Sequence, residues 1–500
     1  MKLRNTLLSA LPSHVKRPGY DRSQITAGII HIGVGGFHRA HQAIYIDRLL
    51  NRGVAHDWGI RGMGLMPADA RMRDVLTAQD GLYTLVQKNP DGSRDVRVIG
   101  SIVDYVYAPD DPAAAVENLA DPGIRIVSLT ITEGGYNFHQ VSGEFDLDNP
   151  AIQADLARPD CPATVFGLVA AALRLRRERG LAPFTVMSCD NVQGNGTMAR
   201  RSFTAYARAV DPGLAEWMDA CVAFPNSMVD RITPATTDFD RADVAERHGI
   251  EDGWPVVCED FIQWALEDVF SAGRPPYELA GVEVVDDVEP YELMKLRLLN
   301  ASHQGLCYFG YLAGYRAVHD AAGDPSIARF LRRYMDEEAT PTLAPVSGVD
   351  MAAYKSRLIE RFTNANVADT VARLCAESSD RIPKWLMPVV RENLAAGRPV
   401  ELSAAIVASW ARYAEAIDEQ GAPIAIVDRL ASRLTAAARR YPDDPSAFIT
   451  DRELFGDVCE DPRFRGPYLA ALCNLHRRGS HATLAALADG TRLSAGPGRA

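Results

Sequence analysis

Three polar residues, Lys295, Asn300 and His303, interrupt one long apolar stretch of the sequence. Residues 291–315 carry apolar side chains at helical spacing, so we expect the three polar groups to stand on one helix. At about 100° per residue, His303 lies roughly 80° and Asn300 roughly 140° around the axis from Lys295, so all three can border one cleft. Burial would lower the pKa of Lys295 toward the range that suits a general base. A snorkelling lysine with satisfied polar neighbours would explain any one of these residues, but explains three together less well.

A second group of residues forms a glycine-rich turn, with Gly33, Gly35 and Gly36 between an apolar run at 29–32 and a helical pattern that reaches about residue 50. A strand, a glycine turn and a helix in this order let the backbone approach the pyrophosphate of a dinucleotide. The match to the GxGxxG pattern is incomplete, because His38 replaces the third glycine. An ordinary tight turn is the alternative, but the strand predicted at 59–66 completes a βαβ unit.

The end of the second predicted strand offers a test of cofactor type. Asp69 follows this strand, and its carboxylate could hold the ribose hydroxyls of NAD, although it lies further along the chain than the usual spacing of about 20 residues. Arg71 and Arg73 are close by and could instead face the 2′-phosphate of NADP. The sequence therefore favours NAD and leaves NADP open.

Polar residues also follow two further predicted strands. Glu133 comes after the strand predicted at 124–131, and Asn191 after the strand at 184–188. At the carboxyl ends of parallel strands such side chains face the ligand crevice of a doubly wound sheet. Turn formation or helix capping would explain either residue equally well at this point.

These groups require an α/β fold with two parts. Short apolar strands alternate with helical patterns in the first half, which is typical of a Rossmann-type doubly wound sheet. From about residue 290 helical patterns dominate, including 291–315, 325–338 and 401–417. We therefore predict a nucleotide-binding domain at 1–285 and a mainly α-helical domain at 286–500. Tyr291 and Lys295 also fit the Tyr/Lys pair of short-chain dehydrogenases, but there the pair belongs to the nucleotide-binding domain.

Composition limits the partners of the protein. The net charge is −12, from 53 basic and 65 acidic residues, which argues against nucleic acid or an anionic membrane as the main partner. No apolar run approaches the roughly 18 residues of a membrane span, and the apolar run after Lys2 and Arg4 is too short for a signal peptide. The eight cysteines are scattered without a zinc-binding pattern. We expect a cytoplasmic protein that acts on small solutes without a bound metal.

Together the motifs resemble the polyol-specific long-chain dehydrogenases, the mannitol dehydrogenase family. The resemblance covers nearly the whole chain apart from its final tail. The matching segments are 33–41, 130–136, 184–191, 224–234 and 291–303.

The resemblance implies a metal-independent, NAD(P)-dependent oxidation of a secondary alcohol, with Lys295 as the base. It implies that Asn191 and Asn300 donate hydrogen bonds to the reacting oxygen, and that His303 orients the substrate. Further implied roles are substrate binding by Arg373, proton relay by Glu292 and Asp230, and cofactor binding by Gly33, Gly35, Gly36, Phe37, His38, Arg39, Asp69 and Glu133.

The family also suggests substrates. Residues 133–136 and 224–226 look more like the mannitol-oxidising branch, so we expect interconversion of D-mannitol and D-fructose, with D-arabinitol or D-sorbitol as further substrates. A reductase of the sugar acids fructuronate or tagaturonate is an alternative, for which Arg381 and Lys384 could supply a cation. A non-catalytic nucleotide-binding sensor is a third hypothesis, disfavoured by the intact polar groups around Lys295. The family likeness suggests a monomer.

Overall fold

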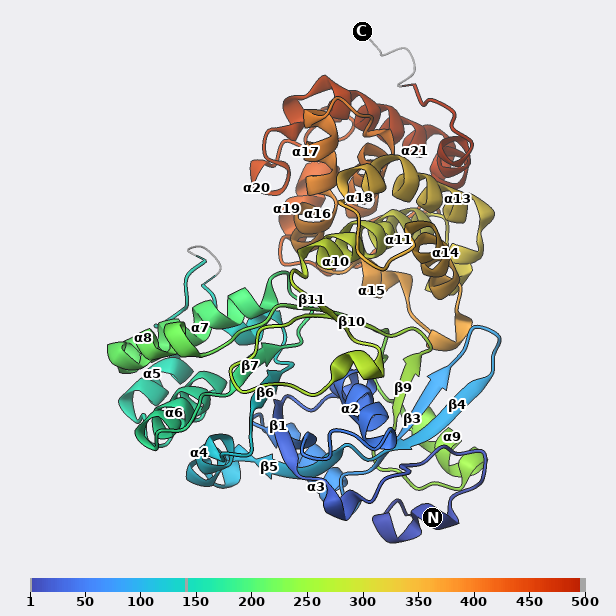
Figure 1. Cartoon of the computed structure of the whole chain (residues 1–500). Helices are drawn as coiled ribbons and strands as arrows, with labels where there is room; N and C mark the ends of the chain where they lie inside the picture. Colours follow the sequence, from blue (N-terminus) through green and yellow to red (C-terminus); the bar gives the residue numbers. More distant parts are fainter. Residues whose placement is uncertain (1, 140–142, 495–500) are drawn as a thin grey trace. The chain divides into compact units, whose positions relative to one another are not determined.

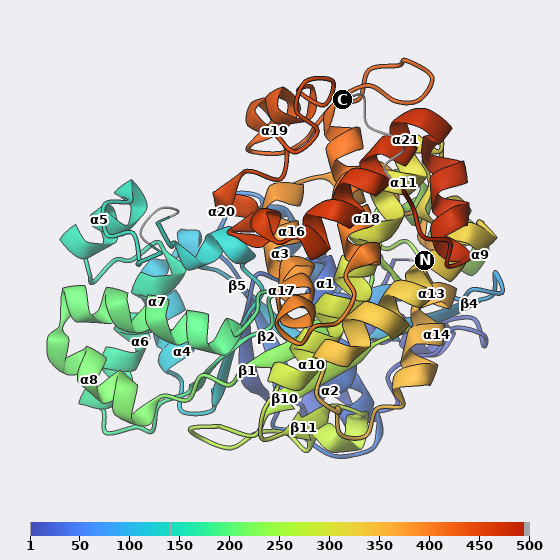
Figure 2. The same ribbon diagram turned by 90° about the horizontal axis from the view of Figure 1, so that it is seen from above.

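The computed structural model describes residues 2–139 and 143–494, which fall into two compact units, 1–289 and 290–500 (Figures 1 and 2). The first unit is built on a sheet of five parallel strands in the order β5-β2-β1-β6-β7. These strands are β1 (Ala27–Ile32), β2 (Gly59–Gly64), β5 (Ile102–Tyr107), β6 (Ile126–Leu129) and β7 (Thr185–Ser188). Four of them match the predicted strands.

Both faces of this sheet are buried. Alternate residues of β1 point to opposite sides, so Ile29 joins one hydrophobic cluster while Ile30 and Ile32 join another. Four helices pack in succession over the second cluster: α4 (Pro112–Ala120), α6 (Val165–Glu178), α7 (Asn195–Val210) and α8 (Pro212–Cys221). The first cluster lies against α2 (Gln42–Asn51) and α3 (Asp69–Ala78). This is the predicted doubly wound α/β architecture.

Two small sheets complete the first unit, and neither was predicted. One has the order β11-β10-β8 and the other β4-β3-β9. Their strands are β3 (Tyr83–Lys88), β4 (Arg94–Ile99), β8 (Ser227–Asp230), β9 (Val256–Glu259), β10 (Gln263–Glu267) and β11 (Glu283–Val285). The remaining helices of this unit are α1 (Gly36–Ala40), α5 (Pro150–Ala157) and α9 (Asp238–His248).

The second unit is helical, as predicted. A continuous helical stretch runs through α10 (Glu289–Met294), η6 (Lys295–Asn300) and α11 (Ala301–Leu312), of which η6 is a π-helix. Around α11 pack α18 (Glu401–Ala414), α13 (Pro325–Tyr334) and α21 (Pro462–Ala488). The other helices are α12 (Val318–Gly323), α14 (Met351–Phe362), α15 (Val371–Cys375), α16 (Ser378–Trp385), α17 (Met387–Ala395), α19 (Ala431–Ala438) and α20 (Arg452–Phe455).

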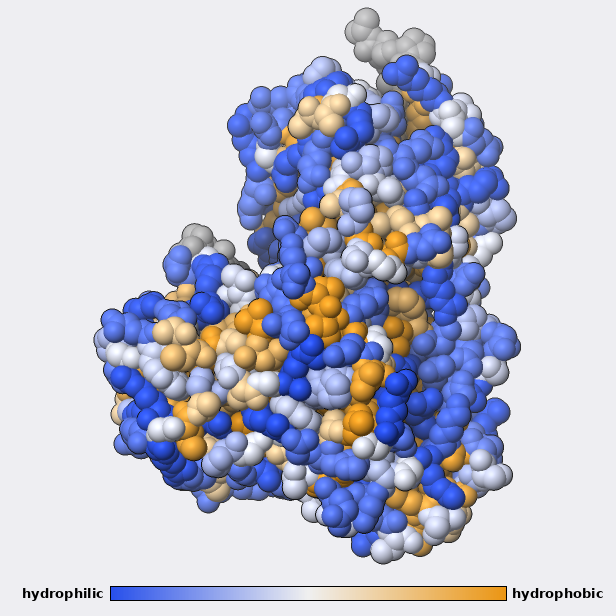
Figure 3. Space-filling model, in the orientation of Figure 1, coloured by the Kyte–Doolittle hydropathy of each residue, from blue (hydrophilic) through white to orange (hydrophobic). Residues whose placement is uncertain are grey.

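Hydrophilic residues cover much of the face shown in Figure 3, and apolar residues form separate patches among them. Within the described residues, no helix combines the length and the apolar character that a bilayer crossing requires.

Candidate functional site

The carboxyl ends of the parallel strands gather most of the predicted cofactor residues at one edge of the sheet. Gly33 follows β1, Asp69 follows β2, Glu133 follows β6 and Asn191 follows β7. The chain adds β2 and β5 on one side of β1 and then β6 and β7 on the other, so the strand order reverses between β1 and β6, and ligands bind at such switch points. The fold therefore places these groups where a doubly wound sheet binds a nucleotide.

The glycine turn has a shape that leaves its backbone bare. Gly33 has φ of +91°, and a Cβ there would lie 2.2 Å from the carbonyl oxygen of Thr130, so no larger residue fits. A Cβ on Gly35 or Gly36 would meet nothing closer than 3.8 and 3.6 Å, respectively. The turn is thus tight on the sheet side and open on the other, which suits the close approach of a pyrophosphate.

A chain of hydrogen bonds between β1 and the end of β6 supports this turn. The Thr130 hydroxyl donates to the Gly33 carbonyl (2.7 Å), so it must accept from His31 Nε2 (2.9 Å). Nδ1 of His31 then accepts from the Ser128 hydroxyl (2.8 Å). Burial lowers the pKa of His31 to about 3, so the ring stays neutral and this tautomer is fixed.

His38 and Arg39 are fully buried, so their side chains support the turn from inside the unit. The His38 ring stacks on His31 with centroids 3.4 Å apart. Arg39 donates to the carbonyls of Gly35 and Trp254. Phe37 is half-buried against the His41 ring, with centroids 4.9 Å apart.

The acidic residue after β2 is held in a defined orientation. Asp69 Oδ2 accepts from the backbone N–H groups of Leu65 and Met66, both at 2.9 Å. Of the two nearby arginines, Arg73 pairs with Asp74 and Asp110, and the exposed Arg71 has its guanidinium 4.5 Å from the centre of the Trp254 ring. This arrangement suits ribose hydroxyls beside Asp69 better than a 2′-phosphate.

Glu133 and Asn191 are exposed. Asp190, which was not predicted from the sequence, connects the two loops that carry them. Asp190 accepts from the backbone N–H groups of Ile131 (3.1 Å) and Thr132 (2.8 Å), and from the hydroxyl of Tyr136 (2.7 Å). Burial raises the pKa of Asp190 in spite of these donors. Its position directly before Asn191, at the end of a buried strand, was the available signal. Asp190 thus fixes the loop after β6 to the end of β7.

Asp230 lies at the end of β8, in one of the small sheets, and is buried. The next residue, Arg231, is also buried and donates to the Ala40 carbonyl at 2.8 Å. The end of β8 is thereby fixed to the helix that follows the glycine turn.

In the helical unit, the π-helical turn η6 carries the predicted base. Its N–H groups bond five residues back, as in the bond from Ala301 to the Leu296 carbonyl, which closes the turn at Asn300. Lys295 and Asn300 stand at its two ends and are both buried, at 7% and 6% exposure. The Asn300 side-chain oxygen is buried without a hydrogen-bond partner among the described residues. Such an atom is one that a bound ligand could satisfy.

A buried arginine anchors the same turn. Arg297 forms a fork with Glu392, with Nη1–Oε2 and Nη2–Oε1 distances of 2.8 and 2.6 Å, and donates to the Thr342 carbonyl at 2.7 Å. The Tyr334 hydroxyl in turn donates to the Arg297 carbonyl at 3.2 Å. These contacts hold a helical turn whose geometry is locally unfavourable.

The remaining predicted residues of this unit lie around the same helix. Glu292 is buried one turn before Lys295. His303 is half-buried on α11, and its ring centroid is 4.5 Å from that of Phe362. Arg373 lies on α15, which packs against α11, and pairs with Asp369. The helix and its neighbour therefore bring Lys295, Asn300, His303 and Arg373 into one part of the unit.

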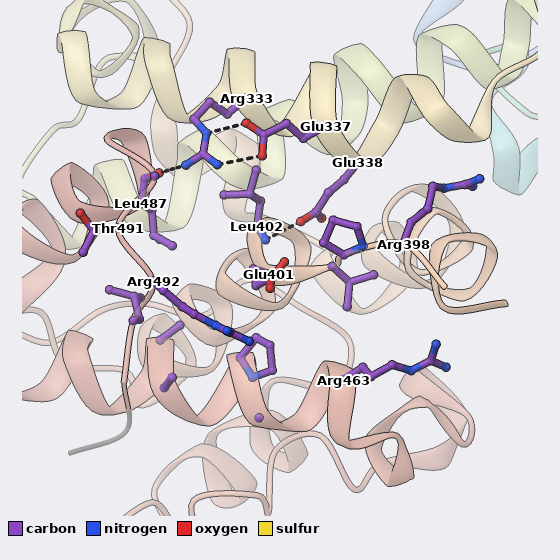
Figure 4. Close-up of a pocket in the computed structure, with 18 of the residues that line it drawn as sticks. Arg333, Glu337, Glu338, Arg398, Glu401, Leu402, Arg463, Leu487, Thr491 and Arg492 are labelled. Atoms are coloured by element: carbon purple, nitrogen blue, oxygen red, sulfur yellow. Dashed lines mark hydrogen bonds and ion pairs between the residues drawn. The ribbon is translucent and has the colours of Figure 1, made fainter. Parts of the chain in front are cut away.

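A large cavity in the helical unit is separate from these residues. It has a volume of about 970 Å³ and is lined by residues such as Arg333, Glu338, Arg398 and Arg492 (Figure 4). None of the predicted site residues lines it. Within the described residues, no group of three or more His, Cys, Asp or Glu side chains is placed to hold a metal ion.

Comparison with known proteins identifies the family. Residues 27–279 match the model of the mannitol dehydrogenase Rossmann domain, and residues 287–474 match the mannitol dehydrogenase C-terminal domain. A mannitol 2-dehydrogenase from Phaeosphaeria nodorum is 45% identical, over 97% of this chain and 85% of its own length. One from Aspergillus fumigatus is 45% identical, over 94% of this chain and 95% of its own.

Two solved structures are similar throughout. Pseudomonas fluorescens mannitol 2-dehydrogenase, in a ternary complex with NAD and D-mannitol, is 45% identical with a TM-score of 0.85, covering 98% of this chain and 100% of that one. A D-sorbitol dehydrogenase in substrate-free form is 39% identical with a TM-score of 0.91, covering 97% and 100%. The chain belongs to the mannitol dehydrogenase family.

Proposed function

We propose that this protein is an NAD-dependent dehydrogenase that oxidises D-mannitol to D-fructose and catalyses the reverse reaction. Its relatives are named mannitol 2-dehydrogenases, and one of them was solved with NAD and D-mannitol. D-Arabinitol and D-sorbitol are proposed as further substrates, and the likeness to a D-sorbitol dehydrogenase supports the second. The observation that carries the proposal is the π-helical turn that buries Lys295 and Asn300 on one helix.

The cofactor would be held by the first unit. The bare turn at Gly33, Gly35 and Gly36 would take the pyrophosphate, and the Asp69 carboxylate the adenosine ribose. When bound, the nicotinamide would accept the hydrogen and its electron pair from the carbinol carbon of the substrate. The carboxylate of Asp69 at this place and the pairing of Arg73 with Asp110 support NAD over NADP.

The residues of this chain would handle the proton and the oxygen. Lys295, as a neutral amine, takes the hydroxyl proton of the substrate and becomes an ammonium. The amides of Asn191 and Asn300 donate to the same oxygen as negative charge develops on it. His303 and Arg373 orient the remaining hydroxyls, and Glu292 and Asp230 pass the proton from Lys295 to solvent. Glu133 would contribute to the cofactor site on the nicotinamide side.

Two further features belong to this proposal. All eight cysteines are free thiols, which suits a reducing compartment such as the cytoplasm. We propose that the chain acts as a monomer, which light scattering after size exclusion would test.

A steady-state panel tests the function. NADH formation at 340 nm is followed with mannitol, arabinitol and sorbitol, and NADH consumption with fructose and fructuronate. Each measurement is repeated with NADP or NADPH. We expect mannitol and NAD to give the highest kcat/KM. Absence of turnover with every pair would favour the non-catalytic sensor, and fructuronate as the best substrate would favour the sugar-acid reductase.

The base is tested by Lys295→Ala. We expect oxidation to fall by at least 10³-fold, in line with the loss of general-base catalysis and of substrate orientation, while NADH binding followed by fluorescence persists. Turnover within tenfold of the wild type would show that Lys295 is not the base.

A further inference from the structure

An acidic residue that no family motif singled out forms an ion pair with the predicted substrate-binding arginine. Asp369 lies four residues before Arg373, and its Oδ1 accepts from Arg373 Nε at 2.6 Å while Oδ2 accepts from Nη2. The side chain of Asp369 is 13% exposed and that of Arg373 is 58% exposed. The carboxylate is therefore set into the unit, and the guanidinium covers it on the open side.

Backbone hydrogen bonds tie this pair to its neighbours. The Thr370 hydroxyl accepts from the Arg373 N–H, and caps α15. The Asp369 carbonyl accepts from the N–H of Val318, and Thr370 forms a β-bridge with Ala317. The pair is thus fixed to α12 as well as to its own helix.

The pair also lies near a second predicted substrate residue. Asp369 is close enough to His303 on α11 for a positive charge on the His303 ring to lower the pKa of Asp369. Burial is the largest single influence on the pKa of Asp369 and raises it, but the hydrogen bonds and charge of Arg373, a charge on His303 and the Thr370 N–H together outweigh burial and hold the pKa below its ordinary value. Asp369 is therefore a carboxylate at neutral pH, and a substrate meets a pair whose net charge is zero.

A neutral pair discriminates between two classes of substrate. The fork with Asp369 uses two of the five N–H donors of a guanidinium, so the others can bind a hydroxyl oxygen. A substrate carboxylate at the same place would meet a guanidinium whose charge Asp369 already balances, and would add a second negative charge near that carboxylate.

The neighbouring arginine is tied to the backbone of α15. Arg381 Nη1 donates to the carbonyls of Leu374 (3.0 Å) and Arg373 (3.3 Å) at the end of α15, and its guanidinium lies 5.6 Å from the centre of the Trp385 ring. One guanidinium nitrogen of Arg381 thus binds the backbone at the end of α15, which fixes where this cation stands.

We propose that Asp369 determines substrate class: by neutralising Arg373 it admits neutral polyols and ketoses and excludes sugar acids. The proposal rests on the proposed function, because it takes Arg373 to bind substrate. It assigns the selection against anions to one carboxylate that the reaction itself does not require.

The test compares fructose and fructuronate reduction in Asp369→Asn and Asp369→Glu. In Asp369→Asn, which keeps the size and an acceptor for Arg373, we expect kcat/KM for fructuronate to rise at least tenfold relative to fructose. Asp369→Glu keeps the charge and should keep the preference for fructose. Glu337→Gln is the matched control, because Glu337 forms a similar fork with Arg333, four residues away in the same unit but outside the predicted site. This variant should change kcat/KM for neither fructose nor fructuronate.

The outcomes are distinct. An unchanged ratio in Asp369→Asn, or an equal loss for both substrates, would show that Asp369 is only structural. If that variant does not fold, inhibition of the wild type decides: fructuronate should bind at least tenfold more weakly than fructose, and equal binding would overturn the proposal. A wild type that turns over neither fructose nor mannitol would instead contradict the proposed function.

Discussion

Removal of the arginine that anchors the π-helical turn should impair catalysis more than stability alone explains. Arg297→Met keeps most of the apolar stem but deletes the fork with Glu392 and the bond to the Thr342 carbonyl. Because Arg297 is 7% and Glu392 46% exposed, the loss falls at the low end for charge-assisted bonds, about 2–3 kcal/mol in total. In a unit of about 200 residues, this lowers Tm by about 4–12 °C.

If the Arg297 contacts hold the turn in its π form, their loss should also lower kcat. A free-energy cost of about 2–3 kcal/mol corresponds to a fall in kcat of about 30- to 150-fold, because the turn would relax and carry Lys295 and Asn300 away from their positions. We would measure kcat for mannitol oxidation, NADH binding by fluorescence and Tm by circular dichroism. NADH binding should stay within twofold of the wild type, because the glycine turn belongs to the other unit.

Arg333→Met is the matched control for this experiment. Arg333 also forms a fork, with Glu337, and donates to a backbone carbonyl, that of Leu487. Its loss should lower Tm without changing kcat, because it lies on α13 and not on the helix that carries Lys295. Equal values of kcat in the wild type and in folded Arg297→Met would refute the anchoring role.

Two further predictions concern the cofactor turn and a buried carboxyl group. Thr130→Val removes the hydroxyl that supports Gly33, and should weaken NADH binding about fivefold, or about 1 kcal/mol, with kcat little changed at saturating NAD. Thr130→Ser keeps the hydroxyl and should bind NADH as the wild type does. Thr204→Val, which loses a similar hydrogen bond on α7, is the control and should leave NADH binding unchanged. Burial raises the pKa of Glu338 to about 7, so the folded state holds a proton that the unfolded state releases from about pH 4.5 upward. The free energy of unfolding should fall by about 2 kcal/mol from pH 5.5 to 7.5 through this group, and denaturant unfolding of Glu338→Gln should lack that component; the same pH dependence in both proteins would contradict this role.

The strands that position the cofactor could be predicted because they are short apolar runs that end in glycine or polar residues. Residues 29–32 and 184–188 are of this kind, and both lie in the parallel sheet. Some strands of the two small sheets escaped prediction because they mix buried and half-exposed residues, as β4 does with Arg94, Asp95 and Arg97. Such strands are stabilised largely by side-chain packing against neighbouring surfaces, which the sequence alone does not show.

The partners of the predicted site residues were harder to find than the residues themselves. Asp369 stands four residues before Arg373, which is the helical spacing of an ion pair, so the pattern was present but common. The support of Gly33 by His31 joins β1 to the end of β6, about 100 residues later, and no local pattern shows it. Local spacing therefore indicates which groups could react, while the contacts that orient them are set by the tertiary fold.

The π-helical turn is where reasoning from regular helices fails. A helix with 100° per residue puts Asn300 about 140° from Lys295, but bonds that reach five residues back turn the chain by less at each step. Asn300 therefore stands closer to the side of Lys295 than the regular spacing indicates. The contacts that compensate for this costly geometry come from Tyr334 and Glu392, 37 and 95 residues beyond Arg297, so the segment 295–300 cannot reveal it alone. A distortion that needs distant support, and that falls on the two residues best suited to the proposed chemistry, is the kind of local irregularity that marks a functional site.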